Sequence, residues 1–242
     1  MAEQPDTHND DNNDKPPPRQ LRSKGQTKAV AKGKLVETTN SLNCLDFFQR
    51  YALDDLHLPI QVKNASNASV LQTGYEDAST ISKQALEACL DLIEQTSAHD
   101  YKNSEAGWSR AKKKKEMKLP DMKYITLNDE RPNHMIAGFV SFMITYEDGF
   151  EVVYVYEIHL APEWQAQGLG KSLIIAVETI GKNVGAEKIM LTVFKANRRA
   201  VDWYCKLGYV EDEFSPEPRK LRNGTVKEPT YVIFSKRLRK VG

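Results

Sequence analysis

The segment from Phe150 to Lys171 constrains the fold more than any other part of the chain. It begins with Phe150–Leu160, the most regular strand pattern in the sequence, in which β-branched and aromatic residues are concentrated. Ala161-Pro162 ends this predicted strand, and a helix is predicted to start at Gly168-Leu169-Gly170. The chain must therefore pass from a strand into a helix through a short loop that contains glycine.

The two glycines of this loop indicate a phosphate-binding site. Backbone N–H groups at a helix start have no partner within the helix and carry partial positive charge, so they bind phosphate readily. Gly168 and Gly170 have no Cβ and allow a pyrophosphate to approach the main chain. The loop is neither a P-loop nor a dinucleotide fingerprint, because their glycine spacings differ from this one.

The remaining hydrophobic patterns predict an α+β fold. A loop is expected at Asn64–Thr73, and turns are expected at Asn128–Asn133 and Glu147–Gly149. Helices are predicted over Leu42–Leu56 (alternatively a hydrophobic anchor), Ile81–Thr96, Glu105–Lys118, from Gly168, and over Asn197–Lys206. Strands are predicted over Met122–Leu127, His134–Tyr146, Phe150–Leu160, Ala186–Phe194, from Gly208, and over Tyr231–Ser235, which is expected to close the sheet.

Residues 1–41 differ in composition from the rest and are predicted to be a disordered tail. They are acidic and amide-rich at first, then basic, with few large apolar side chains to offset the entropy of ordering. The basic half is either simply solvated or a weak contact for an acidic partner such as nucleic acid or the nucleosome. Residues 42–242 are expected to form one domain, with a helical extension over 42–118 and a core over 119–242.

Charge and cysteine content exclude several classes of protein. The 34 Lys and Arg against 33 Asp and Glu give a net charge of +1, which argues against wholesale nucleic-acid binding. Three widely spaced cysteines exclude a disulfide scaffold and favour a reducing compartment, and the five histidines show no metal-ligand spacing. No apolar run approaches the length of a membrane span, and no secretory signal is expected from the first residues.

Two motifs around the glycine loop carry a resemblance to a known family. The loop follows a strand that ends Glu-Ile-His-Leu-Ala-Pro, and it is followed by Asn197-x-x-Ala200-x-x-x-Tyr204-x-x-x-Gly208-Tyr209. This set resembles the GNAT superfamily of acetyl-CoA-dependent N-acetyltransferases over Met122–Ser235. The resemblance implies a mixed, mostly antiparallel, splayed sheet flanked by helices, with acetyl-CoA as co-substrate and no metal.

The resemblance also implies which residues hold acetyl-CoA. The end of the strand faces the pantetheine and acetyl groups, the loop holds the pyrophosphate, and one asparagine contacts the cofactor at the next helix. By position these residues are Ile158, His159 and Leu160 in the strand, Ala166, Gln167, Gly168, Leu169, Gly170 and Lys171 in the loop, and Asn197.

A narrower resemblance covers most of the folded part. Tyr101–Trp108, Val153–Ile158 and Met190–Lys195 are similar to the N-terminal acetyltransferase D family, which acts on the α-amino group of histone H4 and histone 2A. Both histones begin Ser-Gly-Arg-Gly. The resemblance implies a monomer in the nucleus and cytoplasm that binds histone tails, no membrane, and substrate contacts at Tyr101, Thr145, Glu147, Tyr154, Tyr156, Thr192, Ser215 and Tyr231. The chain departs from the family pattern at Thr145, where some members have an acid, and at Ala106, where tryptophan is common.

Three residues are candidates for catalysis: Glu157, Tyr156 and Tyr204. From its pattern alone Glu157 is an exposed strand residue in an ion pair, and the family resemblance implies instead that it is the base. Strict alternation would place it on the strand face opposite Tyr154 and Tyr156. A β-bulge, expected from the family, would re-aim it. Tyr204 is either a proton donor to the departing thiolate or a core residue of its helix. Direct transfer is favoured over an acetyl intermediate on Cys205, because a lone cysteine is more often a packing residue.

Two other functions remain open at this point. The chain could be a GNAT enzyme that acts on lysine side chains or on other protein N-termini. It could also be a chromatin adaptor that binds acetyl-CoA without catalysis.

Overall fold

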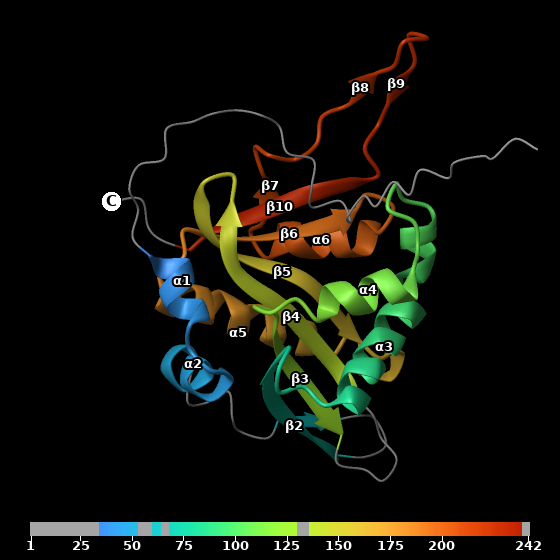
Figure 1. Ribbon diagram of the computed structural model, residues 1–242. Coiled ribbons are helices and arrows are strands. Elements are labelled where there is room, and N and C mark those ends of the chain that lie inside the picture. Colours follow the sequence, from blue (N-terminus) through green and yellow to red (C-terminus); the bar gives the residue numbers. More distant parts are fainter. Residues whose placement is uncertain (1–33, 53–59, 64–67, 130–135, 239–242) are drawn as a thin grey trace, which may run out of the picture.

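The computed structural model describes residues 34–52, 60–63, 68–129 and 136–238, and its centre is a strongly twisted sheet (Figure 1). Its strand order is β1-β2-β3-β4-β5-β6-β10-β7, and the pairing is antiparallel everywhere except between β5 and β6. These strands are β1 (Ile60–Lys63), β2 (Ala68–Asp77), β3 (Lys123–Asp129), β4 (Ile136–Glu147), β5 (Phe150–Leu160), β6 (Lys188–Phe194), β7 (Val210–Glu211) and β10 (Tyr231–Arg237).

Helices cover both faces of the sheet, as the predicted fold class requires (Figure 1). One face packs against α1, α2, α5 and α6, and the larger apolar cluster, which includes Phe47, Val153, Ile180 and Tyr204, lies between these layers. The other face packs against α3 and α4, around Leu90 and Phe139. The helices are α1 (Leu35–Asn40), α2 (Cys44–Tyr51), α3 (Lys83–Lys102), α4 (Arg110–Met117), a 3-10 turn (Pro162–Trp164), α5 (Leu169–Val184) and α6 (Arg198–Lys206).

A β-bulge in β5 determines which side chains face α3 and α4. Ser141 of β4 pairs with Glu157 and the next residue, Phe142, pairs with Val155, so Tyr156 has no opposite residue in β4. The extra residue reverses the alternation beyond it. Glu157 therefore lies on the same side of the sheet as Tyr154, as the family resemblance implied and strict alternation did not.

The bulge coincides with the point where the sheet splits. β5 pairs with β6 only over Val152–Val155 and Lys188–Leu191, whereas β6 continues to pair with β10 as far as Phe194. Beyond Val155 the last residues of β5 follow β4, which pairs with them as far as Leu160. The two halves of the sheet thus separate, and the gap between the ends of β5 and β6 is open to a ligand.

Side-chain caps fix the starts of the helices that border this gap. Ser82 accepts a hydrogen bond from the Ala85 N–H at α3, and Ser109 accepts one from the Lys112 N–H at α4. Asn197 does the same for α6 through the Ala200 N–H, at 3.1 Å. Asn197, predicted to contact the cofactor, is therefore first of all the cap of α6.

Several segments differ from the sequence predictions. The helix expected to end at Thr96 continues as α3 to Lys102 and so carries Tyr101. Residues 35–40, assigned to the tail, form α1, because Val36 and Thr39 find buried positions against the sheet. Residues 68–73 of the loop expected over Asn64–Thr73 belong to β2, and residues 64–67 lie outside the described part of the chain. Strand β1, just before this loop, was not predicted. The helix expected from Glu105 begins only at Arg110. Strand β10 does not close the sheet, because β7 pairs along its outer edge.

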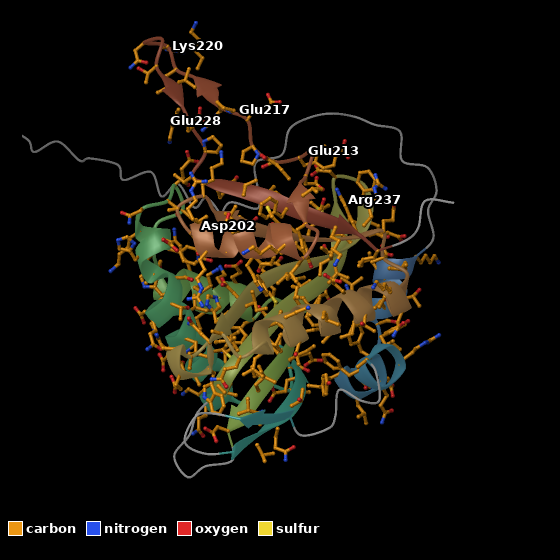
Figure 2. All side chains as sticks on the ribbon, turned by 180° about the vertical axis from the view of Figure 1, so that it is seen from behind. Asp202, Glu213, Glu217, Lys220, Glu228 and Arg237 are labelled. Atoms are coloured by element: carbon orange, nitrogen blue, oxygen red, sulfur yellow. The ribbon has the colours of Figure 1, made fainter. Side chains whose placement is uncertain are left out.

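A short hairpin, β8 (Arg219–Lys220) paired with β9 (Val226–Lys227), was also not predicted. Figure 2 shows it projecting from the sheet with Lys220, Glu217 and Glu228 on or beside it. Residues 1–33, the larger part of the predicted tail, lie outside the described residues. Within the described ranges, no helix combines the length and the apolar character needed to cross a bilayer.

The close contact between α5 and β5 gives a test of this packing. A Cβ on Gly181 of α5 would lie 2.7 Å from Val153 Cγ2 and 2.5 Å from Leu238 Cδ1. We expect Gly181→Ala to lower the free energy of unfolding by about 1–3 kcal/mol, because overpacking exceeds the gain of roughly 0.5–1 kcal/mol from alanine in a helix. Urea denaturation measures this difference.

Gly170→Ala is the matched control in the same helix, since its Cβ would meet no atom closer than 3.6 Å. We expect it to be neutral or slightly stabilising. Equal destabilisation by both substitutions would contradict the close packing of α5 on β5.

Candidate active site

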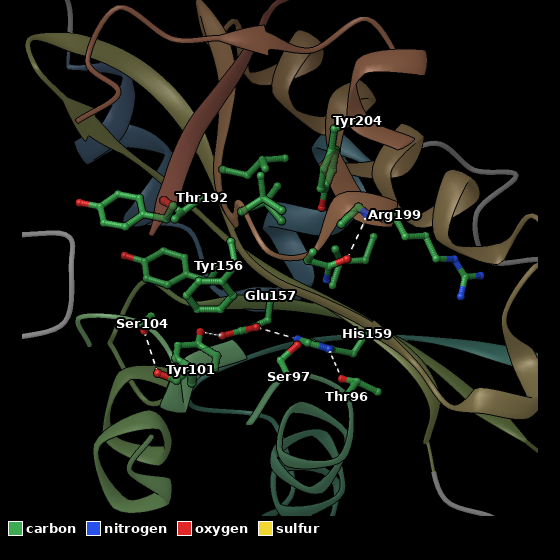
Figure 3. A pocket seen from close by; sticks show the side chains of 18 of the residues that line it. Thr96, Ser97, Tyr101, Ser104, Tyr156, Glu157, His159, Thr192, Arg199 and Tyr204 are labelled. Atoms are coloured by element: carbon green, nitrogen blue, oxygen red, sulfur yellow. Dashed lines mark hydrogen bonds and ion pairs between the residues drawn. The ribbon is translucent and has the colours of Figure 1, made fainter. Parts of the chain in front are cut away.

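One large cavity occupies the gap between the ends of β5 and β6 (Figure 3). It encloses about 1370 Å³ and is bordered by α3, the loop that joins α3 to α4, α6 and β10. Most of the predicted site residues line it: Tyr101, Tyr154, Tyr156, Glu157, Ile158, His159, Leu160, Ala166, Gly168, Gly170, Lys171, Thr192, Asn197, Tyr204 and Tyr231. The structure therefore brings the glycine loop, the predicted base and the tyrosines to one place.

Glu157 is held by three hydrogen-bond donors from three elements. Its Oε1 accepts from Lys113 Nζ of α4 at 2.6 Å and from the Tyr101 hydroxyl of α3 at 2.8 Å. Its Oε2 lies 2.6 Å from Nε2 of His159, two residues along β5. Only 7% of Glu157 is exposed, so these partners replace the water that a carboxylate would otherwise bind.

These contacts set the protonation state of the carboxyl group. Burial by itself would raise the pKa of Glu157, but the charge of Lys113 and the hydrogen bond and charge of His159 lower it to about 2. The same pairing holds the pKa of the Lys113 ammonium well above its ordinary value, in spite of burial. Glu157 and Lys113 are thus an ion pair at neutral pH.

The imidazole of His159 is fixed at both nitrogens. Nδ1 lies 2.6 Å from Thr96 Oγ1, and that hydroxyl donates its hydrogen to the Leu92 carbonyl oxygen at 2.7 Å. On the opposite side of the ring, Nε2 lies 2.6 Å from Oε2 of Glu157. Polar partners at both nitrogens therefore hold the imidazole ring in one orientation between α3 and Glu157.

Four tyrosines surround Glu157. Besides Tyr101, the Tyr154 hydroxyl shares a hydrogen bond of 2.6 Å with Thr192, and the Tyr156 ring packs edge-on against Tyr154. Tyr204 is buried and its ring packs against Trp203, Tyr209 and Phe234, so it is a core residue that also reaches the cavity. Burial, and then the charge of Glu157, raises the pKa of Tyr204, which stays protonated at neutral pH.

The glycine loop forms the other end of the cavity and fits a pyrophosphate. Gly168, the residue before α5, has φ +84°, and a Cβ there would meet nothing within 4 Å. No side chain caps the N-terminus of α5, so its first N–H groups face the cavity mouth without a side-chain partner. Lys171 and Arg199 add positive charge along the lining. These groups could hold the phosphates of coenzyme A.

Five predicted residues lie outside the cavity lining. Leu169 is buried in the core, Gln167 donates to the Glu163 carbonyl oxygen, and the Ser215 hydroxyl accepts from the Ile233 N–H. Thr145 and Glu147 pair with Val152 and Phe150 near the β4–β5 turn. Their roles in binding stay predictions.

Sequence reasoning missed Lys113, Thr96 and Trp203. Lys113 was concealed in the run Lys112–Lys115, which reads as a solvated helix face. Its spacing of four residues from the buried Met117 was the available signal, because the two share one face of α4. Across the described part of the chain, no cluster of His, Cys, Asp and Glu could hold a metal ion.

Comparison with known proteins agrees with this geometry. The model of the Acetyltransferase (GNAT) family matches residues 86–209, more than half of the chain. N-alpha-acetyltransferase 40 of Saccharomyces cerevisiae is 29% identical over 186 residues, 62% of this chain and 64% of the relative. Thialysine N-epsilon-acetyltransferase of Bos taurus is 34% identical over 56 residues, 23% of this chain and 33% of the relative.

The chain thus spans less than two thirds of the length of these curated relatives. The crystal structure of an acetyltransferase of GNAT family from Staphylococcus aureus Mu50 shares the fold, with a TM-score of 0.50 at 12% identity over 69% of this chain and 99% of that chain. The split sheet, the glycine loop at the start of α5 and the family match lead to one conclusion: the chain belongs to the acetyltransferase (GNAT) family.

Proposed function

We propose that the chain transfers the acetyl group of acetyl-CoA to the α-amino group of protein N-termini that begin Ser-Gly-Arg-Gly, as histone H4 and histone 2A do. The observation that carries the proposal is the continuity of one cavity from the glycine loop to the tyrosines around Glu157. The α-amine is favoured because of the relative named as an N-alpha-acetyltransferase. The resemblance of this chain to the N-terminal acetyltransferase D family supports the histone substrate. We further propose that the protein is a monomer that acts in the nucleus and cytoplasm.

Acetyl-CoA supplies an activated thioester. The amine nitrogen forms a bond to the thioester carbon, the carbon–sulfur bond breaks, and the coenzyme leaves as a thiolate that takes up a proton. The amine must lose one proton in exchange. A free α-amino group has a pKa of roughly 7.7–8.0, so a substantial fraction is already neutral near pH 7.5. Glu157 then has to bind and orient the amine and to take part in removing one proton.

Direct transfer of the acetyl group to the amine agrees with the positions of Cys205 and Tyr204. Cys205 is exposed and does not belong to the residues that line the cavity. The Tyr204 hydroxyl reaches the cavity in its protonated form and can donate a hydrogen bond to the thiolate as it leaves. We therefore propose that no acetyl-enzyme intermediate forms.

The walls of the cavity suit a small first side chain. Tyr101, Tyr156 and Tyr231 line it with rings that are packed against their neighbours and cannot move far without loss of contact. A serine followed by a glycine presents no bulk to these rings. A large second side chain would meet them.

Glu147 lies where an extended peptide could reach it. Every second residue of β4 points to the same face, and on one face these are Met143, Thr145 and Glu147. Met143 pairs with Tyr154 of the cavity wall. A peptide that leaves the cavity along this face passes Thr145, which has no charge, and then Glu147. We propose that Glu147 pairs with the arginine at the third position.

Mass spectrometry of peptide products tests the proposed function. Ser-Gly-Arg-Gly-Lys is offered with a free α-amine, with a blocked α-amine, and beside peptides with unrelated N-termini. The proposal predicts one acetyl group on the α-nitrogen of the free peptide and none on the blocked one. Acetylation of the blocked peptide at lysine would favour a side-chain acetyltransferase. Binding of acetyl-CoA with no product from any peptide would favour an adaptor.

The glycine loop supplies a test of acetyl-CoA binding. We expect Gly170→Asp to weaken acetyl-CoA binding at least tenfold by calorimetry, because it puts a negative charge beside the N–H groups proposed to hold the pyrophosphate. Gly170→Ala separates the two effects, because its Cβ lies 3.6 Å from Trp203 and Leu160, fits within the protein and adds no charge. A loss of affinity in Gly170→Ala measures the obstruction of the pyrophosphate by a Cβ, and the additional loss in Gly170→Asp measures the effect of the charge. Unchanged affinity in Gly170→Asp would place the phosphates elsewhere.

Glu147→Ala tests the peptide direction. We expect the KM for Ser-Gly-Arg-Gly to rise about 5- to 30-fold, equivalent to roughly 1–2 kcal/mol for a charge-assisted pair, and the KM for Ser-Gly-Ala-Gly to stay nearly constant. Measuring both peptides with both enzymes closes a double-mutant cycle. An equal rise for the two peptides would mean that the arginine does not meet Glu147.

A further inference from the structure

We infer that Lys113 is a positioning residue of this site, which holds the Glu157 carboxylate in one orientation and keeps it ionised. The inference rests on the proposed function, because it assigns Lys113 a part in the reaction through Glu157. Nothing in the run of lysines on α4 distinguishes Lys113 by residue type. Its position in the fold does.

The ammonium group of Lys113 is enclosed by acceptors. Nζ lies 2.6 Å from Glu157 Oε1, 2.7 Å from the Tyr101 hydroxyl and 2.7 Å from Glu116 Oε2, and 4.7 Å from the centre of the Tyr101 ring. Only 8% of the residue is exposed. An ammonium uses its three hydrogens in this arrangement, so Lys113 is tied to the site rather than to solvent.

The neighbouring lysines provide the contrast. Lys114 pairs with Glu87 on α3, and Lys115 is exposed to solvent. Lys112 is exposed and lies at the border of the cavity. The helical period turns only Lys113 of this run, with Met117, toward β5. Lys115→Met is therefore a control that removes the same charge from the same helix without touching Glu157.

Each of the two carboxylate oxygens of Glu157 has its own hydrogen-bond partners. Oε1 is occupied by Lys113 and Tyr101, and Oε2 faces His159, so the plane of the carboxylate is fixed. A substrate amine must then approach a carboxylate whose orientation is set before it arrives. Fixing the acceptor in advance avoids the cost of ordering it during the reaction.

The charge of Lys113 also controls the basicity of Glu157. The other titratable and charged groups that face Glu157 are Tyr101 from α3, Glu116 from α4, Tyr124 from β3, His159 from β5 and Tyr204 from α6. Without Lys113, burial and the negative charge of Glu116 both favour the protonated acid. The pKa of Glu157 must therefore rise when Lys113 is removed, and the carboxylate is then lost at a higher pH.

The test is the pH profile of kcat/KM for Ser-Gly-Arg-Gly. In the wild-type protein the acidic limb should follow only the ionisation of the substrate amine, because Glu157 stays ionised through this range. In Lys113→Met the ionisation of Glu157 should also appear in the acidic limb. The kcat/KM of this variant should then be lower than that of the wild type by about tenfold or more at pH 6, and the difference should shrink above pH 8. Lys115→Met should keep the wild-type profile, and Lys113→Arg should restore most of it.

Two results would overturn the inference. A loss in Lys113→Met by the same factor at every pH would show a purely structural role. The second result uses Glu157→Gln, which has no carboxylate for Lys113 to act through. Adding Lys113→Met to Glu157→Gln should therefore cause no further pH-dependent loss of kcat/KM, and a loss equal to the one in the wild-type background would overturn the inference.

A measurement without turnover separates this inference from the proposed function. A carboxyl group whose pKa is lowered on folding contributes stability above its unfolded pKa and loses it as the pH falls through the folded pKa. The wild-type protein should therefore lose more unfolding free energy between pH 7 and pH 3 than Lys113→Met does, in urea titrations with Lys115→Met as control. If no peptide is acetylated but this difference appears, the proposed function fails and the inferred control of Glu157 stands. Equal losses would contradict it.

Discussion

The buried ion pair between Glu157 and Lys113 is the interaction on which the rest of the site depends. A carboxylate that is 7% exposed is unfavourable unless donors replace its water, and here they come from α3, α4 and β5 itself. Removing one partner of such a pair leaves an uncompensated charge in the interior. The two helices on this face of the sheet are therefore part of the candidate site, because they contribute Tyr101, Thr96 and Lys113 to the contacts of Glu157 and His159.

The bulge at Tyr156 makes this arrangement possible. One extra residue in β5 turns Glu157 to the side of Tyr154 and ends the pairing with β6, so the carboxylate and the opening of the sheet arise from the same irregularity. Beyond the opening, the chain leads through a 3-10 turn to the N-terminus of α5. The glycine loop proposed to hold the phosphates and the carboxylate proposed to meet the amine thus belong to one continuous stretch of chain, Tyr154–Lys171.

Much of the fold and of the candidate site could be predicted from the sequence. The features that could not be predicted have physical reasons. The strand over Phe150–Leu160 and the helix after Gly168 carry strong local patterns, and the structure confirms both. Local patterns cannot show that Val36 is buried against the sheet or that Lys113 is buried under Glu157, because the strands that cover these two residues come much later in the chain. The bulge has no signal in composition, and only the family resemblance indicated it. Most predicted cofactor residues line one cavity, whereas Thr145 and Glu147 lie near the β4–β5 turn, outside that lining.

Titration of the Glu157 side-chain carboxyl by ¹³C NMR tests the central claim most directly. With ¹³C-labelled glutamate, the Glu157 resonance is the one that Glu157→Gln removes. The account predicts that it stays in the ionised position from neutral pH down to about pH 3, because the pKa is held near 2 by Lys113 and His159. A titration midpoint at roughly 4.3 or above, the range of an unperturbed or merely buried glutamate, would contradict the account.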